Sequence, residues 1–503
     1  NVYIRLYRSD RMNVNHIMKT KPYKHQKDAL DQAKHLRVFG FFMEMGTGKS
    51  KVLIDNIAYL RATKEINFAL ILAPKGVYRN WVEKEIPTHF TDTLEYKIMY
   101  WQSNRTMAYE KNLNEFFKKT TTAMRIFIMN IEAFSSPRGI KAGTWMAKKF
   151  GERGLIAIDE STAIKNPKAK RTKSLIKIGK DFKYKRILTG SPVTKSPLDL
   201  WSQFEFLDPG ILGFPSYYAF LNRHANLLKR QLGSHSFQQI VGYKRLDELL
   251  EKIGLYIFRV LKKDCIDLPN KIYVTRYVQN TDEQNKMYKK IQQEAILLLD
   301  TAVVTAPMMI TQMLRLQQIL SGHLKSDDGQ MLEFPTNRLN ELLNICEETS
   351  GKMLIYSRFR YDIVSISNKL AQVYGKESVG CYYGDTTQEE RVRVINAFED
   401  KDNPMRFFVG NPSTAGYGIT LNQANTVVYY ANDFNLETRM QSEDRCHRIG
   451  QTNKVTYIDL ISENTIDERI VKALKNKIDI GAKVLGEEAR QWLQIDPKQK
   501  TML

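Results

Sequence analysis

The feature that most constrains the fold is a glycine-rich turn between two apolar runs. Residues 38–42 (VFGFF) have the composition of a buried strand, and residues 51–57 have the pattern of a helix. Between them stand Gly46, Thr47, Gly48, Lys49 and Ser50. Glycines let backbone N–H groups crowd around an anion, the lysine reaches phosphate oxygens, and the hydroxyl binds a cation. This order predicts a phosphate-binding loop, although the strict pattern has a glycine where this chain has Met. The plain alternative is a glycine turn between a core strand and a helix.

Two carboxylates follow a second apolar run. Residues 154–158 (GLIAI) are followed directly by Asp159 and Glu160. A short aliphatic run of this kind predicts a buried parallel strand that delivers acids to its carboxyl edge. We expect Asp159 to hold a magnesium ion through water and Glu160 to orient and deprotonate an attacking water. A strand followed by a solvated acidic turn is the alternative, and the phosphate loop upstream disfavours it.

A third motif, residues 441–451 (QSEDRCHRIGQ), carries two arginines. Arg445 and Arg448 are three residues apart, so on a helix they would share one face. Guanidinium groups fork onto phosphate oxygens. We therefore expect a pair of arginine fingers for the γ-phosphate of a nucleotide, delivered by a different lobe from the one with the glycine loop. Cys446, between them, is expected to be a small packing residue.

Composition restricts the class of partner and the compartment. The formal net charge of +21 indicates a polyanion, either nucleic acid or an acidic membrane surface. No run spans a bilayer, because Asp300 interrupts the longest candidate, residues 295–310. Residues 1–18 do not resemble a signal peptide. The four cysteines lack metal-site spacing, so we expect reduced thiols and a cytoplasmic location, or a nuclear one in a eukaryote.

Strand-like runs alternate with helical stretches in two parts of the chain. They begin near 68, 125, 155 and 186, and again near 352, 378, 406, 426 and 455. This rhythm is typical of parallel sheets with crossover helices. Between about 208 and 335 it gives way to amphipathic stretches at 218–229, 246–257 and 281–320, which predict helices.

Read together, the motifs resemble the superfamily-2 helicase-like translocases, and among them the SWI/SNF-type ATPases. The resemblance rests on motifs that recur in the family's order. They are PYKHQ at 22–26, the glycine loop, LAPK at 72–75 with NW at 80–81, DESTAIKN at 159–166, LTGSP at 188–192 with LW at 200–201, LKKD at 261–264, LIYS at 354–357, GD at 384–385 with Arg391, residues 413–421, and the arginine run.

The resemblance implies an α/β fold with two tandem RecA-like lobes and helical insertions. It implies an N-terminal extension at 1–21, lobe 1 at 22–270 with a protrusion at 208–262, and lobe 2 at 271–475 with an insertion at 280–335. A C-terminal helix and basic tail would occupy 476–503. ATP and Mg²⁺ would bind between the lobes, and the protein would act as a monomer.

The resemblance also implies residue roles. Asp159, Glu160, Lys49, Arg445 and Arg448 would be catalytic, with Ser50 and Asp159 on the metal. Gln26 would contact adenine, because PYKHQ resembles the family's adenine-reading glutamine motif. The remaining nucleotide contacts would be Gly46, Thr47, Gly48, Gly418 and Gln441. DNA contacts would come from Lys75, Asn130, Thr194, Arg358, Ser413 and Thr414.

Two departures from the family pattern affect the expected coupling. Thr162 stands where most relatives carry a histidine that is thought to link the hydrolysis site to the LTGSP segment. The segment at 416–420 (GYGIT) is one glycine short of the commonest remodeller form and is closer to the annealing-helicase branch.

Three functions remain open at this point. The first is an ATP-dependent motor that translocates on double-stranded DNA without separating its strands, as a minimal stand-alone family member. The second is a helicase or fork-remodelling and annealing enzyme on branched DNA, with a wedge hosted by residues 208–335. The third is an ATP-gated DNA clamp with little turnover, disfavoured because the catalytic lysine, glutamate and arginines are all present. RNA duplex is a less favoured substrate.

Overall fold

The computed structural model describes residues 18–75, 77–103, 105–118, 122–194, 196–232, 235–265, 268–300, 306–326, 328–415, 419–448 and 450–484. The chain divides into two compact units. Unit 1 comprises Asn1–Pro192, Leu200–Phe214 and Lys252–Cys265, and unit 2 comprises Val193–Asp199, Pro215–Glu251 and Ile266–Leu503. Each unit is described by itself.

Unit 1 is built on a seven-stranded sheet with the order β3-β4-β2-β5-β6-β1-β9. Every neighbouring pair in it is parallel, so the carboxyl ends of all strands meet at one edge. The strands are β1 (Val38–Met43), β2 (Phe68–Ala73), β3 (Tyr96–Tyr100), β4 (Met124–Asn130), β5 (Gly154–Asp159), β6 (Tyr184–Leu188) and β9 (Ile257–Val260). The central strands are buried along their length, which explains their continuous apolar runs.

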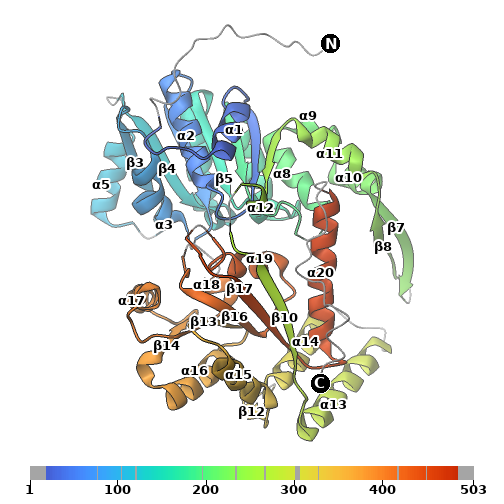
Figure 1. The fold of residues 1–503 in the computed structure, drawn as a ribbon. Coiled ribbons are helices and arrows are strands. Elements are labelled where there is room, and N and C mark those ends of the chain that lie inside the picture. Colours follow the sequence, from blue (N-terminus) through green and yellow to red (C-terminus); the bar gives the residue numbers. More distant parts are fainter. Residues whose placement is uncertain are drawn as a thin grey trace. The chain divides into compact units, whose positions relative to one another are not determined.

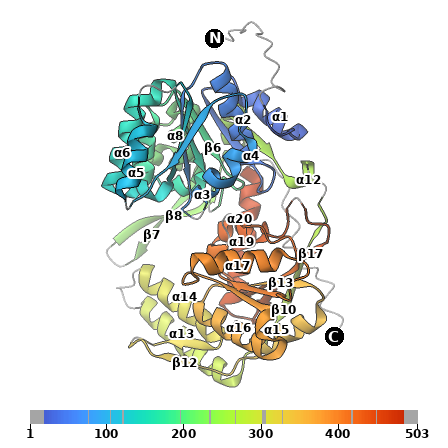
Figure 2. The same ribbon diagram turned by 90° about the vertical axis from the view of Figure 1, so that its left-hand side faces the viewer.

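Helices cover both faces of this sheet (Figures 1 and 2). On one face lie α1 (Lys24–Ala33), α2 (Lys49–Ala62) and α4 (Ile86–His89), whose apolar residues share one core with β1, β2, β4 and β5. On the other lie α6 (Pro137–Phe150), α7 (Lys170–Gly179) and α8 (Asp199–Leu207). There the ring centroids of Phe68 and Phe150 are 4.6 Å apart, and those of Phe42 and Phe204 are 6.1 Å apart.

Unit 2 contains a six-stranded parallel sheet with the order β10-β17-β16-β13-β15-β14. Its strands are β10 (Lys271–Tyr277), β13 (Lys352–Ser357), β14 (Val379–Tyr382), β15 (Phe407–Gly410), β16 (Ala424–Ala431) and β17 (Val455–Ile461). Helices α15 (Asn337–Glu348) and α16 (Arg360–Tyr374) pack in one core against it, and α17 (Gln388–Glu399) packs in another. A third apolar cluster joins α13 (Asp282–Asp300), α14 (Ala306–Leu320) and α20 (Ile466–Val484).

The two predicted α/β lobes are confirmed, but the region between them is less helical than its pattern indicates. The helix expected at 218–229 is wrong in its second half. Helix α10 (Tyr217–His224) ends, and β7 (Ala225–Leu232) pairs antiparallel with β8 (His235–Tyr243). The backbone of Ala225 is already extended, and Lys244 N donates to the carbonyl of His224 to close the pairing. Pairing with a partner strand determines the conformation of residues 225–232, and the helical periodicity of the sequence does not reveal that partner.

Two other expected helices are shorter than predicted. The stretch at 246–257 forms α11 (Leu246–Gly254), and its end instead begins β9 at the edge of the unit 1 sheet. The stretch at 281–320 forms α13 and α14, with residues 301–305 outside the described part. A small hairpin follows, of β11 (His323–Lys325) and β12 (Met331–Glu333). Strands β3, β9 and β10 are absent from the predicted set.

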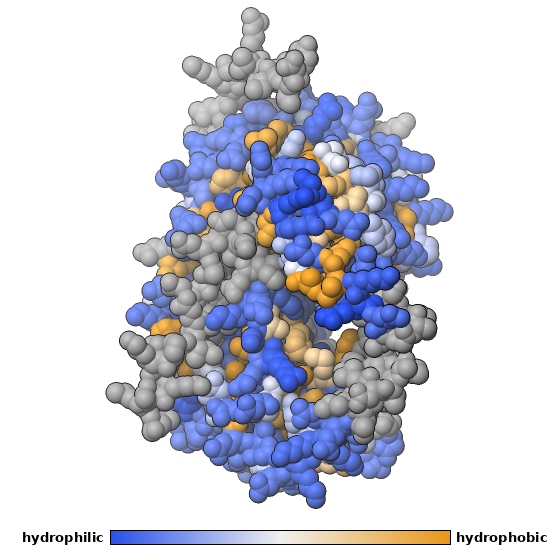
Figure 3. Space-filling model, turned by 90° about the vertical axis from the view of Figure 1, so that its right-hand side faces the viewer, coloured by the Kyte–Doolittle hydropathy of each residue, from blue (hydrophilic) through white to orange (hydrophobic). Residues whose placement is uncertain are grey.

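Among the described residues no helix is both long enough and apolar enough to cross a membrane. The face drawn in Figure 3 is mostly hydrophilic, with apolar residues gathered in small patches. All four cysteines are free thiols, as predicted. Cys446 is fully buried, and burial raises the pKa of its thiol to about 12, in agreement with a packing role.

Candidate active site

The glycine loop of unit 1 presents unbonded backbone donors at the start of a helix. Strand β1 ends at Met43 and α2 begins at Lys49. Gly46 and Gly48 have φ of 80° and 90°, in the left-handed region that favours glycine. Within the described part of the chain, no hydrogen bond is found from the N–H groups of Gly46, Gly48, Lys49 or Ser50. Free N–H groups at the N-terminus of a 14-residue helix form an anion-binding site.

Neutral hydrogen bonds hold the loop in this shape. The buried hydroxyl of Thr47 donates to the Glu44 carbonyl at 2.6 Å. The Thr47 carbonyl in turn lies 2.8 Å from His25 Nε2 and accepts from Gln26 Nε2 at 3.0 Å. A Cβ atom at Gly48 would lie 2.2 Å from that Gln26 nitrogen, which is a second reason for glycine there. Helix α1 therefore fixes the loop.

This arrangement changes the reading of Gln26, which is predicted to contact adenine. Its nitrogen donates to Thr47, and its Oε1 accepts from the backbone N–H of Tyr23 at 3.0 Å in a capping box. Gln26 lies beside the loop as expected, but both ends of its amide bind within the chain. The adenine contact stays a prediction.

Asp159 lies at the carboxyl end of β5, separated from β1 by β6. Its two carboxylate oxygens accept from Trp81 Nε1 and from the backbone N–H of Glu160, each at 3.0 Å. Burial raises the pKa of Asp159, while the nearby charge of Lys49 and these two hydrogen bonds oppose the rise. The structure thus brings together Lys49 and Asp159, which are 110 residues apart in the sequence.

Glu160 adopts a strained backbone conformation. Its φ is 50° and its ψ is 60°, a left-handed geometry that costs a non-glycine residue about 1–3 kcal/mol. Such strain persists only where the surroundings fix it, and it clusters at functional sites. Here the sharp turn places the Glu160 side chain directly after the strand that carries Asp159.

A buried bridge runs from this turn to the LTGSP segment. Ser161 Oγ donates to Gln203 Oε1 at 2.7 Å, and Gln203 Nε2 donates to the Pro192 carbonyl at 2.9 Å. Both Ser161 and Gln203 have no exposed surface. Gln203 is not among the predicted site residues, although a glutamine inside the apolar run of α8 is a signal of a buried polar contact.

The LTGSP segment also packs directly on the glycine loop. A Cβ atom at Gly190 would lie 3.1 Å from the backbone nitrogen of Met45. Arg259, on β9, donates from Nη1 to the carbonyls of Phe42 and Gly190 at 3.0 and 3.1 Å. Arg259 is a second residue that sequence reasoning missed, because its strand was not predicted.

The donor set around Asp159 fits a magnesium ion bound with a nucleotide. Ser50 and Asp159 offer a hydroxyl and a carboxylate, the oxygen ligands that Mg²⁺ prefers. No cluster of three or more metal-ligating side chains is found among the described residues.

In unit 2 the two arginines of the third motif do not lie on a helix, so that part of the prediction is wrong. Helix α19 (Leu436–Glu443) ends before them. The backbone N–H of Arg445 donates to the Ser442 carbonyl, three residues back, instead of to the Gln441 carbonyl. The guanidinium groups of the two arginines nevertheless lie close together. Nη1 of Arg445 and Nη1 of Arg448 donate to the same carbonyl, that of Ile419, at 3.1 and 3.4 Å. Gln441 is buried on α19, and its carbonyl accepts from Arg445 Nε. Gly418 lies outside the described residues.

A buried ionic network supports α19. Arg439 forms ion pairs with Glu443 and Asp459, and Lys271 binds Glu443 at 3.0 Å. Burial alone would lower the pKa of Arg439, but these carboxylates and the ring of Tyr429 outweigh it, so the guanidinium stays charged. The pKa of Glu443 is lowered by Lys271 and Arg439 in spite of burial.

The predicted DNA contacts form two small groups. In unit 1, Lys75 N and Asn130 Nδ2 donate to the two oxygens of Glu132 at 3.4 and 3.3 Å. In unit 2, Asn411 donates to the Arg358 carbonyl at 2.9 Å and accepts from Ser413, which is followed by Thr414.

Thr194 is different from the other predicted contacts. It is 2% exposed, and its hydroxyl donates to Asp199 at 3.1 Å. In this conformation its hydroxyl is bound within the chain, and the DNA contact of Thr194 stays a prediction.

Comparisons with known proteins agree with this architecture. The SNF2-related domain model matches residues 40–326, and the helicase conserved C-terminal domain model matches residues 336–450. The chain belongs to the SNF2-related family. Within this family it is 26% identical over 482 residues to an uncharacterized ATP-dependent helicase, MG018, of Mycoplasma genitalium, covering 92% of this chain and 42% of that protein.

Two further relatives extend the comparison. The putative ATP-dependent helicase/translocase YwqA of Bacillus subtilis is 24% identical, covering 93% of this chain and 49% of YwqA. The human SWI/SNF-related regulator of chromatin subfamily A member 1 is 26% identical, covering 88% of this chain and 41% of that protein. The chain therefore spans less than half the length of these relatives. Among solved structures, the Sulfolobus solfataricus SWI2/SNF2 ATPase core in complex with dsDNA matches with a TM-score of 0.41 and 25% identity, covering 96% and 97% of the two chains.

Proposed function

We propose that this SNF2-related chain is an ATP-driven motor that binds double-stranded DNA through its phosphate backbone and moves along it. The observation that carries the proposal is the junction in unit 1 of free N–H donors, Lys49 and Asp159. A nucleoside triphosphate needs these groups together, because its phosphates require both hydrogen-bond donors and charge neutralisation. Two bacterial relatives that carry the name of ATP-dependent helicase support the reading.

The chemistry is divided between the two units. The N–H groups of the loop and Lys49 bind the phosphates, and Glu160 orients the attacking water and accepts its proton. Ser50 and Asp159 would hold Mg²⁺, which neutralises developing charge on the phosphates. Arg445 and Arg448 of unit 2 stabilise the γ-phosphate in the transition state. An arginine finger is worth about three to five orders of magnitude in rate, so hydrolysis depends on both units.

DNA binding in this proposal uses phosphate contacts. Lys75 and Asn130 in unit 1, and Arg358, Ser413 and Thr414 in unit 2, are the proposed residues. The net charge of +21 supports attraction of a polyanion. Contacts to phosphate carry no sequence information, so binding is indifferent to sequence. Affinity falls about a thousandfold or more between roughly 50 and 200 mM salt, and a fall of less than tenfold contradicts a grip on many phosphates.

The hairpin β7–β8 is the observation that favours a second candidate function, that of a fork-remodelling or annealing enzyme. It forms a two-stranded sheet separate from both large sheets. Leu228, Ile240 and Val241 on it are 43%, 39% and 56% exposed. An exposed hairpin with apolar side chains has the chemistry needed to separate paired bases, because such side chains can replace base stacking.

Steady-state ATP hydrolysis tests the proposal. It is measured without nucleic acid and with blunt duplex, single-stranded or forked DNA, and Lys49→Ala serves as the blank. Strong stimulation by plain duplex supports the motor. Stimulation only by forked or single-stranded DNA favours the second candidate. Absence of stimulation by all three contradicts both and favours the clamp. Glu160→Gln is expected to bind ATP and to hydrolyse it far more slowly; hydrolysis at the parent rate overturns the site assignment.

Replacing residues 227–241 by a short glycine–serine linker separates the two candidates. A motor without strand separation keeps its duplex-stimulated hydrolysis and loses nothing on forked DNA. A fork-remodelling enzyme keeps the same hydrolysis but loses strand exchange on forked DNA, measured by fluorescence of labelled arms.

A further inference from the structure

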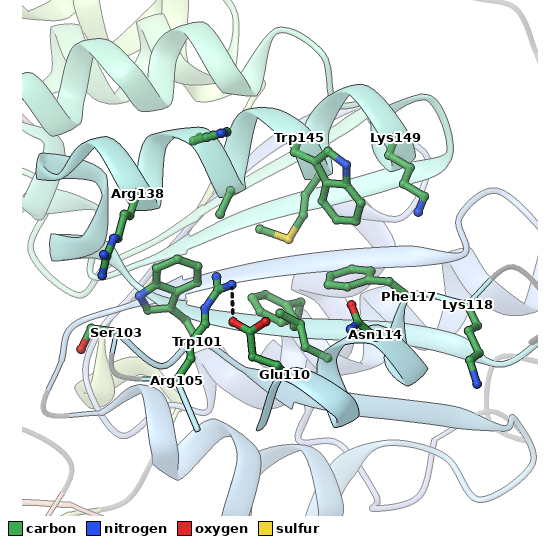
Figure 4. A pocket seen from close by; sticks show the side chains of 15 residues that line it. Trp101, Ser103, Arg105, Glu110, Asn114, Phe117, Lys118, Arg138, Trp145 and Lys149 are labelled. Atoms are coloured by element: carbon green, nitrogen blue, oxygen red, sulfur yellow. Dashed lines mark hydrogen bonds and ion pairs between the residues drawn. The ribbon is translucent and has the colours of Figure 1, made fainter. Parts of the chain in front are cut away.

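A cavity of about 920 Å³ opens on unit 1 between α5 (Met107–Phe116) and α6. Its walls come from these two helices and from the segment that follows β3 (Figure 4). None of its lining residues belongs to the nucleotide or DNA contacts proposed above.

The lining is strongly cationic. It contains five cations, namely Arg105, Lys118, Arg138, Lys141 and Lys149, and a single acid, Glu110. Arg105 already pairs with Glu110 at 3.4 Å, and Lys118 pairs with Glu115. No hydrogen bond or ion pair to the side chains of Arg138, Lys141 or Lys149 is found within the described residues. Three positive charges in one cavity without acidic partners favour a ligand with several negative charges.

Aromatic rings lie beside these charges. Trp145, in the middle of α6, is 44% exposed. Its ring meets that of Phe117 edge to face at 4.9 Å, and Lys149 Nζ lies 4.6 Å from its centroid. Trp101 forms another part of the wall, with the Arg105 guanidinium 4.9 Å from its ring. Trp101 is only 6% exposed, so of the two tryptophans Trp145 is the one that is open to a ligand. Basic side chains beside an exposed aromatic ring are typical of surfaces that bind single-stranded nucleic acid.

One face of helix α6 lines the cavity, and a different face, which carries two glycines, packs against the protein. A Cβ atom at Gly139 would lie 2.1 Å from the Ala133 carbonyl, and one at Gly143 would lie 2.5 Å from the Phe134 ring. These close approaches hold α6 against the turn after β4. The residues at 138, 141, 145 and 149, spaced by three or four, then share the face that lines the cavity.

The cavity also begins at the edge of the sheet where the proposed DNA contacts lie. Trp101 directly follows β3, while Lys75 and Asn130 mark the carboxyl ends of the parallel strands β2 and β4. Paired bases of a duplex are stacked on each other and cannot reach a tryptophan inside a cavity, whereas the bases of a single strand can.

We propose that this cavity binds a short segment of single-stranded nucleic acid. Phosphates contact Arg138, Lys141 and Lys149, and one base stacks on Trp145. The site goes beyond the proposed function and does not require ATP hydrolysis.

The charge part of the proposal is tested with a labelled oligothymidylate of about 12 nucleotides, within the usual site sizes of single-strand binders. Binding to the 503-residue chain is followed by fluorescence anisotropy without ATP. Lys141→Glu/Lys149→Glu is expected to lower the affinity about tenfold or more. The slope of log affinity against log salt should become shallower by about 1.4, since each lost phosphate contact is worth about 0.7. Lys148→Glu is the matched control, because Lys148 is exposed on the same helix and does not line the cavity.

The stacking part is tested with Trp145→Leu and an abasic strand of equal length. Stacking of one base is worth about five- to 150-fold in affinity. The parent chain should prefer the thymidine strand over the abasic strand by such a factor, and Trp145→Leu should abolish the preference. Thermal melting of each variant checks its fold, and the lysine variants, at exposed positions, keep the test valid if Trp145→Leu unfolds.

Three results overturn the proposal. Unchanged affinity in the lysine variant shows that the cavity does not bind the strand. An equal loss for duplex shows a general basic surface. Displacement of the strand by free mononucleotide as effective as by unlabelled strand shows a nucleotide pocket. Failure of the proposed function is a separate result, the absence of DNA-stimulated hydrolysis by the unmodified chain.

Discussion

The segments proposed to bind phosphate are held in place by different interactions in the two units. In unit 1, His25 and Gln26 hold the glycine loop through hydrogen bonds to one backbone carbonyl, and the proposed binding groups are mainly backbone N–H groups. In unit 2 the helix before the two arginines is held by buried ion pairs of Arg439 with Glu443 and Asp459.

Because their supporting interactions differ, the two units should respond differently to substitution. A neutral hydrogen bond contributes about 0.5–1.5 kcal/mol, so the loop of unit 1 depends on many small terms and on glycines. Removing one partner of a buried ion pair costs about 3–5 kcal/mol, because the other charge remains uncompensated. Unit 2 should therefore be sensitive to single charge removals, and unit 1 to changes of backbone conformation.

The largest expected effect separates binding from catalysis. Arg448→Ala should lower kcat by about three to five orders of magnitude, because it removes transition-state charge stabilisation. Its affinity for a fluorescent ATP analogue should stay near that of the parent chain, whereas Lys49→Ala should lose both. Steady-state kinetics and equilibrium titration check this. Loss of nucleotide affinity in Arg448→Ala would contradict the division of roles.

The second prediction concerns the ionic network of unit 2. Asp459→Asn leaves the buried Arg439 with one carboxylate partner fewer and should lower the free energy of unfolding by about 3–5 kcal/mol. Urea unfolding followed by circular dichroism measures the change. Asp402→Asn is a matched control, since Asp402 is exposed in the same unit. A loss below about 1 kcal/mol would remove the contrast between the units.

The third prediction tests a buried ion pair of the unit 1 helix α2. Asp55 binds Lys51 at 2.6 Å, yet burial raises the pKa of Asp55 to about 6 against the opposing effects of Lys51. Because this folded-state pKa lies above the unfolded value of about 3.9, the unfolded state releases its proton first as pH rises. Asp55 should therefore contribute a fall of about 3 kcal/mol in unfolding free energy between about pH 4 and pH 6.

Asp55→Asn isolates this contribution. The difference in unfolding free energy between the parent chain and the variant should change with pH across that interval and stay constant above about pH 7. Denaturant unfolding at several pH values measures it. A difference independent of pH would show that Asp55 is ionised throughout and that the unit 1 pair resembles those of unit 2.

The smallest expected effect concerns the bridge between the Glu160 turn and the LTGSP segment. Gln203→Leu removes two neutral hydrogen bonds and should cost about 1–3 kcal/mol of stability. If the bridge positions Glu160, kcat should fall with little change in nucleotide affinity. Ser161→Ala should give a similar fall, and the double variant should be less than additive. Full additivity would show that the two residues act independently.

Much of the fold and of the candidate site could be predicted because the signals are local. The strand–loop–helix order around Lys49 and the strand that ends at Asp159 were read correctly from short apolar runs and from glycines that permit left-handed backbone. The hairpin β7–β8, and the strands β3, β9 and β10, were missed, since each depends on a partner strand that periodicity does not reveal. The helix expected at Arg445 is absent because the backbone N–H of Arg445 donates to the Ser442 carbonyl and its Nε donates to the Gln441 carbonyl, contacts that periodicity does not reveal.

The two parallel-sheet units and the chemical groups at each strand end follow from local patterns in the amino-acid sequence. Which distant groups meet depends on how the elements pack. This packing placed Lys49 beside Asp159, linked Ser161 through Gln203 to Pro192, and turned Trp145 toward a cationic cavity. The reason is the distance along the sequence over which each kind of interaction acts. Backbone conformation and strand burial depend on neighbouring residues, whereas buried hydrogen bonds and charge clusters depend on residues that become neighbours only when the sheets have formed.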